Sequence, residues 1–220
     1  MALFPSFGGR AFFIKEKSMA ITGYVWFDAE FSSLELEQAV LLQVAAMVTD
    51  AHLKPLTNDL GPLEMAIQLD PGVEVSPWVK EHLTGLITRC GEGSAVSLEE
   101  ADARLSEWLQ TQFGSCSKPI HERPLLAGNS VHNDWLMVRR HLPKFHRELH
   151  YRLLDVSSFK TVWEAWGEGS SFDKEQLDEL NRYFPAGEID ALAPHDALFD
   201  IQASIAEMAY YREKLRFDSI

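Results

Sequence analysis

Apolar residues in the first third of the chain gather in runs that have the length of β-strands. Three such runs, residues 22–29, 39–50 and 64–70, are separated by polar segments that contain proline, glycine or serine. The connections are short enough to join antiparallel neighbours. The pattern therefore predicts three antiparallel strands in succession.

The pattern then changes to the period of a helix. Residues 76–88 are expected to be helical, with Pro77 in the first turn, and Ser97 and Glu100 fit a capping box that opens the next helix. The later elements alternate: a strand at 124–130, a helix at 133–142, a strand at 151–159, a polar helical or irregular stretch at 160–190, and a helix from about 194 to 214.

This order of elements favours an α/β fold. Three antiparallel strands followed by alternating helices and strands predict a mixed five-stranded sheet with helices on both faces. Residues 19–220 contain no repeat or linker, so we expect one domain. Residues 1–18 lack the cleavage site of a signal peptide. We expect either that the true start is Met19 or that residues 1–18 are a loosely held extension. The stretch is too short and too poor in serine to favour a transit peptide.

Composition narrows the range of partners. The net charge of −13, from 33 acidic and 20 basic side chains, argues against a long nucleic acid held by a basic surface. A short substrate held locally through metal ions is still compatible with this charge. No apolar run approaches the length of a membrane span. Two cysteines suit a reducing compartment, so we expect a cytoplasmic location, although two could form one disulfide.

Two carboxylates end the first apolar strand, in the segment YVWFDAEFSSL. Asp28 and Glu30 are two positions apart, so a strand places both on one face. Two like charges beside each other in a core are costly unless a positive charge lies between them. A divalent metal ion is the usual solution, and hard cations prefer oxygen ligands.

Three further residues carry chemistry, although each also has a simpler interpretation. Asp134 follows the strand end LLAGNSVHN, where it could be a helix-capping or first-turn residue. Asp200 lies on the flank of the apolar stripe of the last helix, which is typical of a solvated residue. His195 precedes it by five positions and could be a surface loop histidine. The pair Asp28 and Glu30 is harder to explain without a ligand.

Together, these motifs resemble those of the DEDD exonucleases of the His subtype, and within them the oligoribonucleases. The resemblance covers residues 22–215 and rests on three stretches in order: WFDAEFSSLELEQAVLLQVAAMVTD, LLAGNSVHNDWLMVRRHLPKFHRELHYRLLDVSSFK and HDALFDIQASIAEMAYYRE. A single D-x-E is a weak signal, whereas three motifs in order, with a histidine five residues before the last aspartate, are a strong one. The resemblance implies an RNase H-like fold.

The resemblance also implies a mechanism. Asp28, Glu30, Asp134 and Asp200 would hold two Mg²⁺ or Mn²⁺ ions at the scissile phosphate, and His195 would take the proton from the attacking water. The products would be 5′-mononucleotides released from the 3′ end. Within one regular helix His195 and Asp200 would point about 140° apart, so we expect His195 on the loop or first turn before the helix.

Five substrate contacts follow from the same resemblance. Leu34 matches a wedge between terminal bases, Trp78 a base-stacking tryptophan, and Ser130 a residue near the 5′ phosphate. Tyr151 and Arg152 match a pair contributed across a homodimer to cap a very short substrate. Core packing is the alternative for Trp78, and a strand-start aromatic residue is the alternative for Tyr151.

The expected function is 3′–5′ exoribonuclease activity on short single-stranded oligonucleotides, with RNA preferred over DNA. Three departures weaken the expectation of dinucleotide preference: Ser32-Ser33 replaces a usual Thr-Gly, Gln43 replaces a common Glu, and the residues around Trp78 align with a small gap. One alternative is a related exonuclease that trims longer RNA tails or single-stranded DNA. The other is a catalytically silent domain that binds nucleotides or a protein, which the presence of all four acids and the histidine disfavours.

Overall fold

The computed structural model describes residues 22–56, 61–114, 119–167, 169–191 and 193–215. The predicted extension at 1–18 and the proposed start at Met19 lie outside these residues. Five strands form one sheet in the order β3-β2-β1-β4-β5. Their bounds are β1 Tyr24–Phe31, β2 Leu41–Thr49, β3 Leu63–Ala66, β4 Leu125–Gly128 and β5 Leu153–Asp155.

The sheet is mixed, as predicted. Strands β1, β2 and β3 pair antiparallel, with Asp28 opposite Ala45 and Glu30 opposite Gln43, and β4 and β5 add in parallel beside β1. The parallel half places the carboxyl ends of β1 and β4 at one edge of the sheet, where ligand sites of open α/β sheets form. The end of β1 is therefore the expected place for a ligand site in this fold.

Helices cover both faces of this sheet. The α-helices are α1 Pro77–His82, α2 Thr84–Cys90, α3 Leu98–Phe113, α4 His132–His141, α5 Pro143–Glu148, α6 Val156–Trp166, α7 Leu177–Tyr183 and α8 Ala197–Lys214, with a short 3-10 turn at Ile120–Glu122. Within the described residues, none of these helices has both the length and the apolar character needed to cross a membrane.

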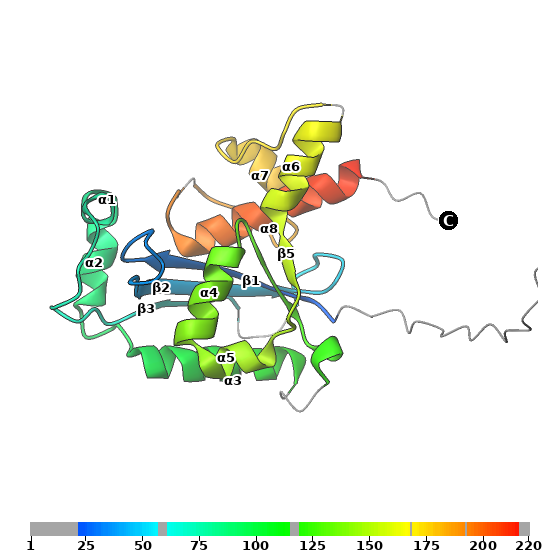
Figure 1. The fold of residues 1–220 in the computed structure, drawn as a ribbon. Coiled ribbons are helices and arrows are strands. Elements are labelled where there is room, and N and C mark those ends of the chain that lie inside the picture. Colours follow the sequence, from blue (N-terminus) through cyan, green and yellow to red (C-terminus); the bar gives the residue numbers. More distant parts are fainter. Residues whose placement is uncertain (1–21, 57–60, 115–118, 168, 192, 216–220) are drawn as a thin grey trace, which may run out of the picture.

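Alternate residues of β1 divide the core into two layers. Val25, Phe27 and Ala29 are buried with side chains of α3, α4 and α5. Trp26, on the opposite face, is buried with side chains of α6, α7 and α8. Figure 1 shows α3 and α5 on one side of the sheet and α6, α7 and α8 on the other, with α1 and α2 at its end. The predicted α/β fold with helices on both faces is confirmed.

Several predicted boundaries were wrong. The helix expected at 76–88 is two helices, α1 and α2, because the backbone at Leu83 leaves the helical conformation (φ −115°, ψ 31°). The strand expected at 64–70 ends at Ala66. The strand expected at 151–159 contains three residues only, because Asp155 caps a helix by accepting a hydrogen bond from the Ser157 amide.

Candidate active site

The two carboxylates of β1 share the face that α8 covers. Asp28 and Glu30 have the same parity as Trp26, which is buried against the α8 layer. Burial raises the pKa of Asp28 well above its ordinary value, and the charges of Asp200 and Glu30 raise it further. Burial, followed by the charges of Asp200 and Asp196, raises the pKa of Glu30 to about 7. The site therefore concentrates negative charge in a poorly solvated place.

Asp134 reaches the same place from the other layer. At the end of β4, Gly128 approaches β1 so closely that a Cβ there would lie 2.9 Å from the Phe27 carbonyl oxygen. The chain then turns into α4, and the buried Asp134 Oδ1 accepts a hydrogen bond from the Ala29 amide at 3.1 Å. Burial, with the charge of Asp28, raises the pKa of Asp134 well above its ordinary value. The Ala29 amide, between Asp28 and Glu30 in the chain, thus orients the Asp134 carboxylate.

His195 and Asp200 meet at the start of α8. Asp196 caps this helix, so His195 lies before it, as predicted, with a positive φ of 64°. The His195 amide donates to Asp200 Oδ2 at 3.1 Å, which brings the two side chains together despite their spacing. Burial raises the pKa of Asp200, while the charge of Lys174 and the His195 amide oppose this rise.

These groups suit a divalent cation. Single ligand atoms of Glu30, His195 and Asp200 lie within 4.8 Å of one another. Carboxylate oxygens that are crowded and partly desolvated are stabilised in their charged form by a hard cation such as Mg²⁺ or Mn²⁺. The residues present therefore fit a metal centre built on oxygen ligands.

A cavity of about 430 Å³ opens beside Glu30. Its walls include Leu34, which is 92% exposed, and Trp78, which is 46% exposed. The Trp78 ring stacks on His82, with centroids 4.5 Å apart, and meets the His195 ring edge-on at 5.3 Å. The structure thus brings two predicted substrate contacts together with Glu30, and Trp78 also with His195.

Hydrogen bonds of Ser32 hold the turn that bears Leu34. Ser33 is not among the described residues that have a positive φ, so the serine there carries no left-handed strain. The buried Ser32 accepts a hydrogen bond from the Val40 amide through its hydroxyl, and from the Ser76 amide through its carbonyl oxygen. Ser32 therefore joins the Leu34 turn to the residue that caps α1.

The other three predicted contacts lie elsewhere. Ser130 is exposed at the turn before α4, with a positive φ of 50°, and its amide donates to Asp155 Oδ1 and to Ser157 Oγ. Tyr151 is exposed and stacks on His150, and Arg152 lies over the Tyr151 ring. Neither Tyr151 nor Arg152 lines the cavity beside Glu30.

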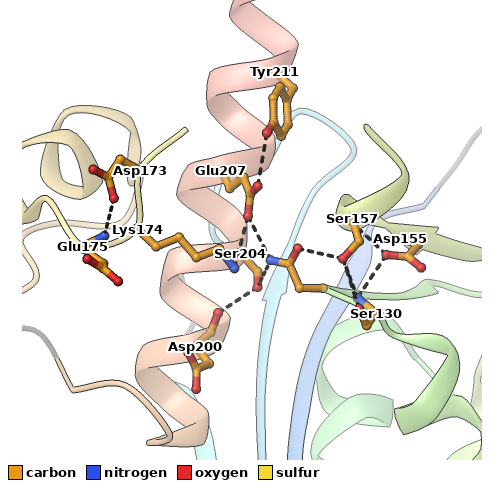
Figure 2. Close-up of polar contacts among 11 residues, drawn as sticks. Ser130, Asp155, Ser157, Asp173, Lys174, Glu175, Asp200, Ser204, Glu207 and Tyr211 are labelled. Carbon is orange, nitrogen blue, oxygen red and sulfur yellow. Dashed lines mark hydrogen bonds and ion pairs between the residues drawn. The ribbon is translucent and has the colours of Figure 1, made fainter. Parts of the chain in front are cut away.

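Sequence reasoning missed a polar network behind the carboxylates. Glu207 is buried in α8 and pairs with Lys174 at 3.1 Å, and the Asn129 amide donates to Glu207 and to Ser204 (Figure 2). The sequence did contain one signal of this network. A glutamate within the apolar segment SIAEMAYY of a buried helix requires a partner.

Comparisons with known sequences agree with this site. An exonuclease family model, RNase T, matches residues 25–208. The oligoribonuclease of Francisella tularensis is 28% identical over 192 residues, which cover 87% of this chain and 94% of the relative. The mitochondrial oligoribonuclease of Mus musculus is 33% identical over 196 residues, which cover 87% of this chain and 72% of the relative.

Solved structures agree on the fold. Exonuclease I of Methylocaldum szegediense matches with a TM-score of 0.61 at 21% identity, covering 87% of this chain. A zinc-bound complex of E. coli exonuclease I with single-stranded DNA matches with a TM-score of 0.61 at 17% identity, covering 89%. The chain spans about two fifths of the length of these structures (40% and 41%), so they support the fold alone. The family model, which spans most of the sequence, is decisive: the chain belongs to the RNase T family of exonucleases.

Proposed function

We propose that this nuclease is a 3′–5′ exoribonuclease that degrades short oligoribonucleotides to 5′-mononucleotides in a metal-dependent reaction. One observation carries the proposal: ligand atoms of Glu30, His195 and Asp200 lie within 4.8 Å of one another beside a cavity that Glu30 lines. The buried carboxylates of Asp28 and Asp134 stand close enough for charge interactions within the same group. The two oligoribonuclease relatives, each matched over most of its length, support the choice of short RNA.

Asp28, Glu30, Asp134 and Asp200 would hold two Mg²⁺ or Mn²⁺ ions. When bound, such ions supply the charge neutralisation and the activated water that phosphodiester hydrolysis requires. The residues themselves fix the geometry: β1 presents two carboxylates on one face, the Ala29 amide orients Asp134, and the His195 amide orients Asp200. The pKa shifts agree with this role, because carboxylates that are unfavourable when charged alone become favourable beside a cation.

We propose that His195 is the general base. It is exposed, it precedes α8, and its ring makes an edge contact with Trp78, so it adjoins both Asp200 and a residue of the cavity wall. An imidazole in this position could accept a proton from a water that attacks a phosphate bound in the cavity. Its position outside the helix leaves its side chain free of the α8 packing.

Replacing His195 with asparagine is expected to lower kcat by about 10²- to 10⁴-fold, the usual contribution of a positioned general base. Mn²⁺ affinity measured without substrate should change little. His52→Asn, at an exposed histidine, is the matched control. A large loss of Mn²⁺ affinity in the His195 variant would instead make His195 a metal ligand.

Leu34 and Trp78 would bind the terminal bases. An exposed leucine and a half-exposed tryptophan on opposite segments of one cavity can clamp an unstacked base by apolar contact and stacking. The cavity is small, and the net charge of −13 disfavours long RNA held along a surface. Both features support a substrate of a few nucleotides.

Replacing Trp78 with alanine is expected to raise KM for a dinucleotide. Stacking of one base on an aromatic ring contributes about 1–3 kcal/mol, which corresponds to about a 5- to 150-fold change. Trp78→Phe should lie between the alanine variant and the native protein. Trp166→Ala, at a tryptophan that is 80% exposed on α6, is the control. An unchanged KM in the Trp78 variant would assign this ring to packing.

Hydrolysis of 5′-labelled RNA of two, five and twenty nucleotides, with Asp134→Asn as the control for contamination, tests the proposal. We expect the native protein to hydrolyse the dinucleotide rapidly and the Asp134→Asn variant to leave it intact. Preference for the longest RNA, or for matched DNA, would favour the related exonuclease of longer substrates. Absence of hydrolysis on every substrate would favour the silent nucleotide-binding domain.

We also propose that residues 19–220 form one exonuclease domain, that the protein is a cytoplasmic homodimer, and that Ser130 lies near the 5′ phosphate. Tyr151, 58% exposed, and Arg152 would then complete the substrate site of the partner subunit. Neither residue lines the cavity of its own chain. Cys90, a buried free thiol, is compatible with a reducing compartment.

A further inference from the structure

An ion pair with a buried carboxylate and a lysine that is 34% exposed lies behind the carboxylate site and takes no part in the proposed reaction. Glu207, in α8, has a side chain that is only 1% exposed. Its carboxylate accepts hydrogen bonds from the Tyr211 hydroxyl at 3.2 Å and from the side-chain amide of Asn129 at 3.1 Å. It also pairs with Lys174 Nζ at 3.1 Å. Figure 2 shows Lys174 reaching α8 from one side of the helix.

This pair acts on the same face of α8 as Asp200. Glu207 follows Asp200 by seven positions, and at about 100° per residue the two lie almost in line along the helix. Ser204 lies between them: its hydroxyl donates to the Asp200 carbonyl oxygen at 2.8 Å and accepts from the Asn129 amide at 2.8 Å. The Asp200 face of α8 is therefore bonded to the residue that follows β4.

The network continues to the opposite side of the site. Asn129 Oδ1 accepts from the Ser157 hydroxyl at 3.1 Å, and Ser157 Oγ accepts from the Ser130 amide at 2.9 Å. Asp155 Oδ1 accepts from the same amide, which holds Ser130 at its positive φ (Figure 2). A continuous series of contacts thus runs from Lys174 to the turn that begins α4.

Lys174 is presented by an anchored loop. Phe172, two residues earlier, is buried in the core, and the Ser170 carbonyl oxygen accepts from both the Tyr210 hydroxyl and the Trp163 ring nitrogen. The position of the ammonium is therefore determined by the fold rather than by a flexible surface chain.

Stability alone gives a weak reason for such a pair. Apolar residues of similar volume often stabilise a protein as well as a buried ion pair does, because ion pairs lose hydration. A fully bonded polar network, in contrast, fixes one arrangement of the segments that it joins. Here the segments are the loop at 169–176, α8, the end of β4 and the start of α6.

We propose that Lys174 and Glu207 form a positioning pair, which holds the Asp200 face of α8 and the Ser130 turn at the separation that metal and substrate require. The inference rests on the proposed metal-dependent function of the site. Groups that orient metal ligands typically contribute about 10- to 100-fold to metal affinity or activity.

The double variant Lys174→Met/Glu207→Met tests the pair without leaving a buried charge alone. We expect the metal-free double variant to remain folded but to unfold at a lower temperature than the native protein, because the buried Tyr211 hydroxyl loses its acceptor. Mn²⁺ affinity, measured by calorimetry without substrate, should fall about tenfold, and kcat should fall more than KM changes. The single variant Lys174→Arg, which keeps the ion pair, should retain Mn²⁺ affinity and kcat close to those of the native protein.

Lys144→Met is the control, because it removes a lysine whose ion pair with Glu99 is exposed and lies between α5 and α3. A double variant with native Mn²⁺ affinity and native kcat would overturn the inference. If the native protein binds Mn²⁺ but cleaves no RNA, the proposed function fails, and the affinity comparison alone decides: a tenfold loss supports the pair and an unchanged affinity overturns it. A native protein that binds no Mn²⁺ overturns both proposals.

Discussion

Replacing Asp28 with asparagine is expected to lower RNA hydrolysis by at least about a thousandfold. The change removes a carboxylate from the centre of the cluster, and the charge stabilisation that metal ions provide amounts to several kcal/mol, at about tenfold for each 1.4 kcal/mol. The same variant should unfold at a higher temperature than the native protein when metal is absent. Burial and the charges of Asp200 and Glu30 make a charged Asp28 unfavourable in the folded chain.

A loss of activity together with a gain in metal-free stability distinguishes a metal ligand from an ordinary structural aspartate. Activity and thermal unfolding in EDTA should be measured on the same preparation. Asp70→Asn, at an exposed aspartate, makes the same change in charge and should alter neither quantity much. A destabilised Asp28→Asn protein, or one that retains activity, would contradict the assignment of Asp28 as a metal ligand.

The second large effect concerns pH. The pKa of Glu30 is raised from 4.5 to about 7 in the folded protein, so between these values the folded state binds more protons than the unfolded state. Stability contributed by this group is therefore lost as pH rises through that window. The raised pKa values of Asp28, Asp134 and Asp200 act in the same direction. Saturating Mn²⁺ should reverse the loss, because the cation binds the deprotonated carboxylates.

Thermal midpoints from pH 5 to 8, in EDTA and in Mn²⁺, measure this linkage. The lowered pKa values of three histidines, caused first by burial, oppose the trend: His141, His146 and His150. Glu30→Gln isolates the contribution of interest, and its midpoint in EDTA should exceed the native midpoint by a margin that grows with pH. A margin that is constant or shrinks with rising pH would show that the loss of stability does not come from the charge on Glu30.

The strand that bears the site was predictable because its pattern is local. A continuous apolar run that ends in two carboxylates of equal parity indicates both a buried strand and a shared face, and Asp28 and Glu30 lie as expected in β1. The resemblance to the DEDD exonucleases singled out His195, and helix geometry then predicted its place, since a regular helix would point it about 140° away from Asp200. It does lie before the Asp196 cap.

The errors fall where short-range signals compete. LLDVSSF contains apolar and β-branched residues typical of a strand, yet Asp155 and Ser157 form a cap, and the helix begins at Val156. The break at Leu83 has Gly85 two positions later as its only nearby signal. At 153–157 a local helix cap therefore outweighs the strand propensity of the neighbouring residues.

The polar network could not be predicted because its members are distant in sequence. Lys174 and Glu207 are separated by α7, and Asn129 contacts residues 75 and 78 positions later in the chain. A buried glutamate in SIAEMAYY predicts some partner, but only the fold identifies which one. The same holds for Ser130, whose positive φ depends on acceptors from the start of α6.

Calorimetric titration of the native protein with Mn²⁺, in the presence of a non-hydrolysable dinucleotide analogue, tests the central claim most directly. The four converging carboxylates predict two bound ions per chain, and they predict that Asp134→Asn, which removes the ligand held by the Ala29 amide, reduces this number or the affinity strongly. Absence of Mn²⁺ binding by the native protein, or native binding by the variant, would contradict a metal-dependent nuclease centre at this site.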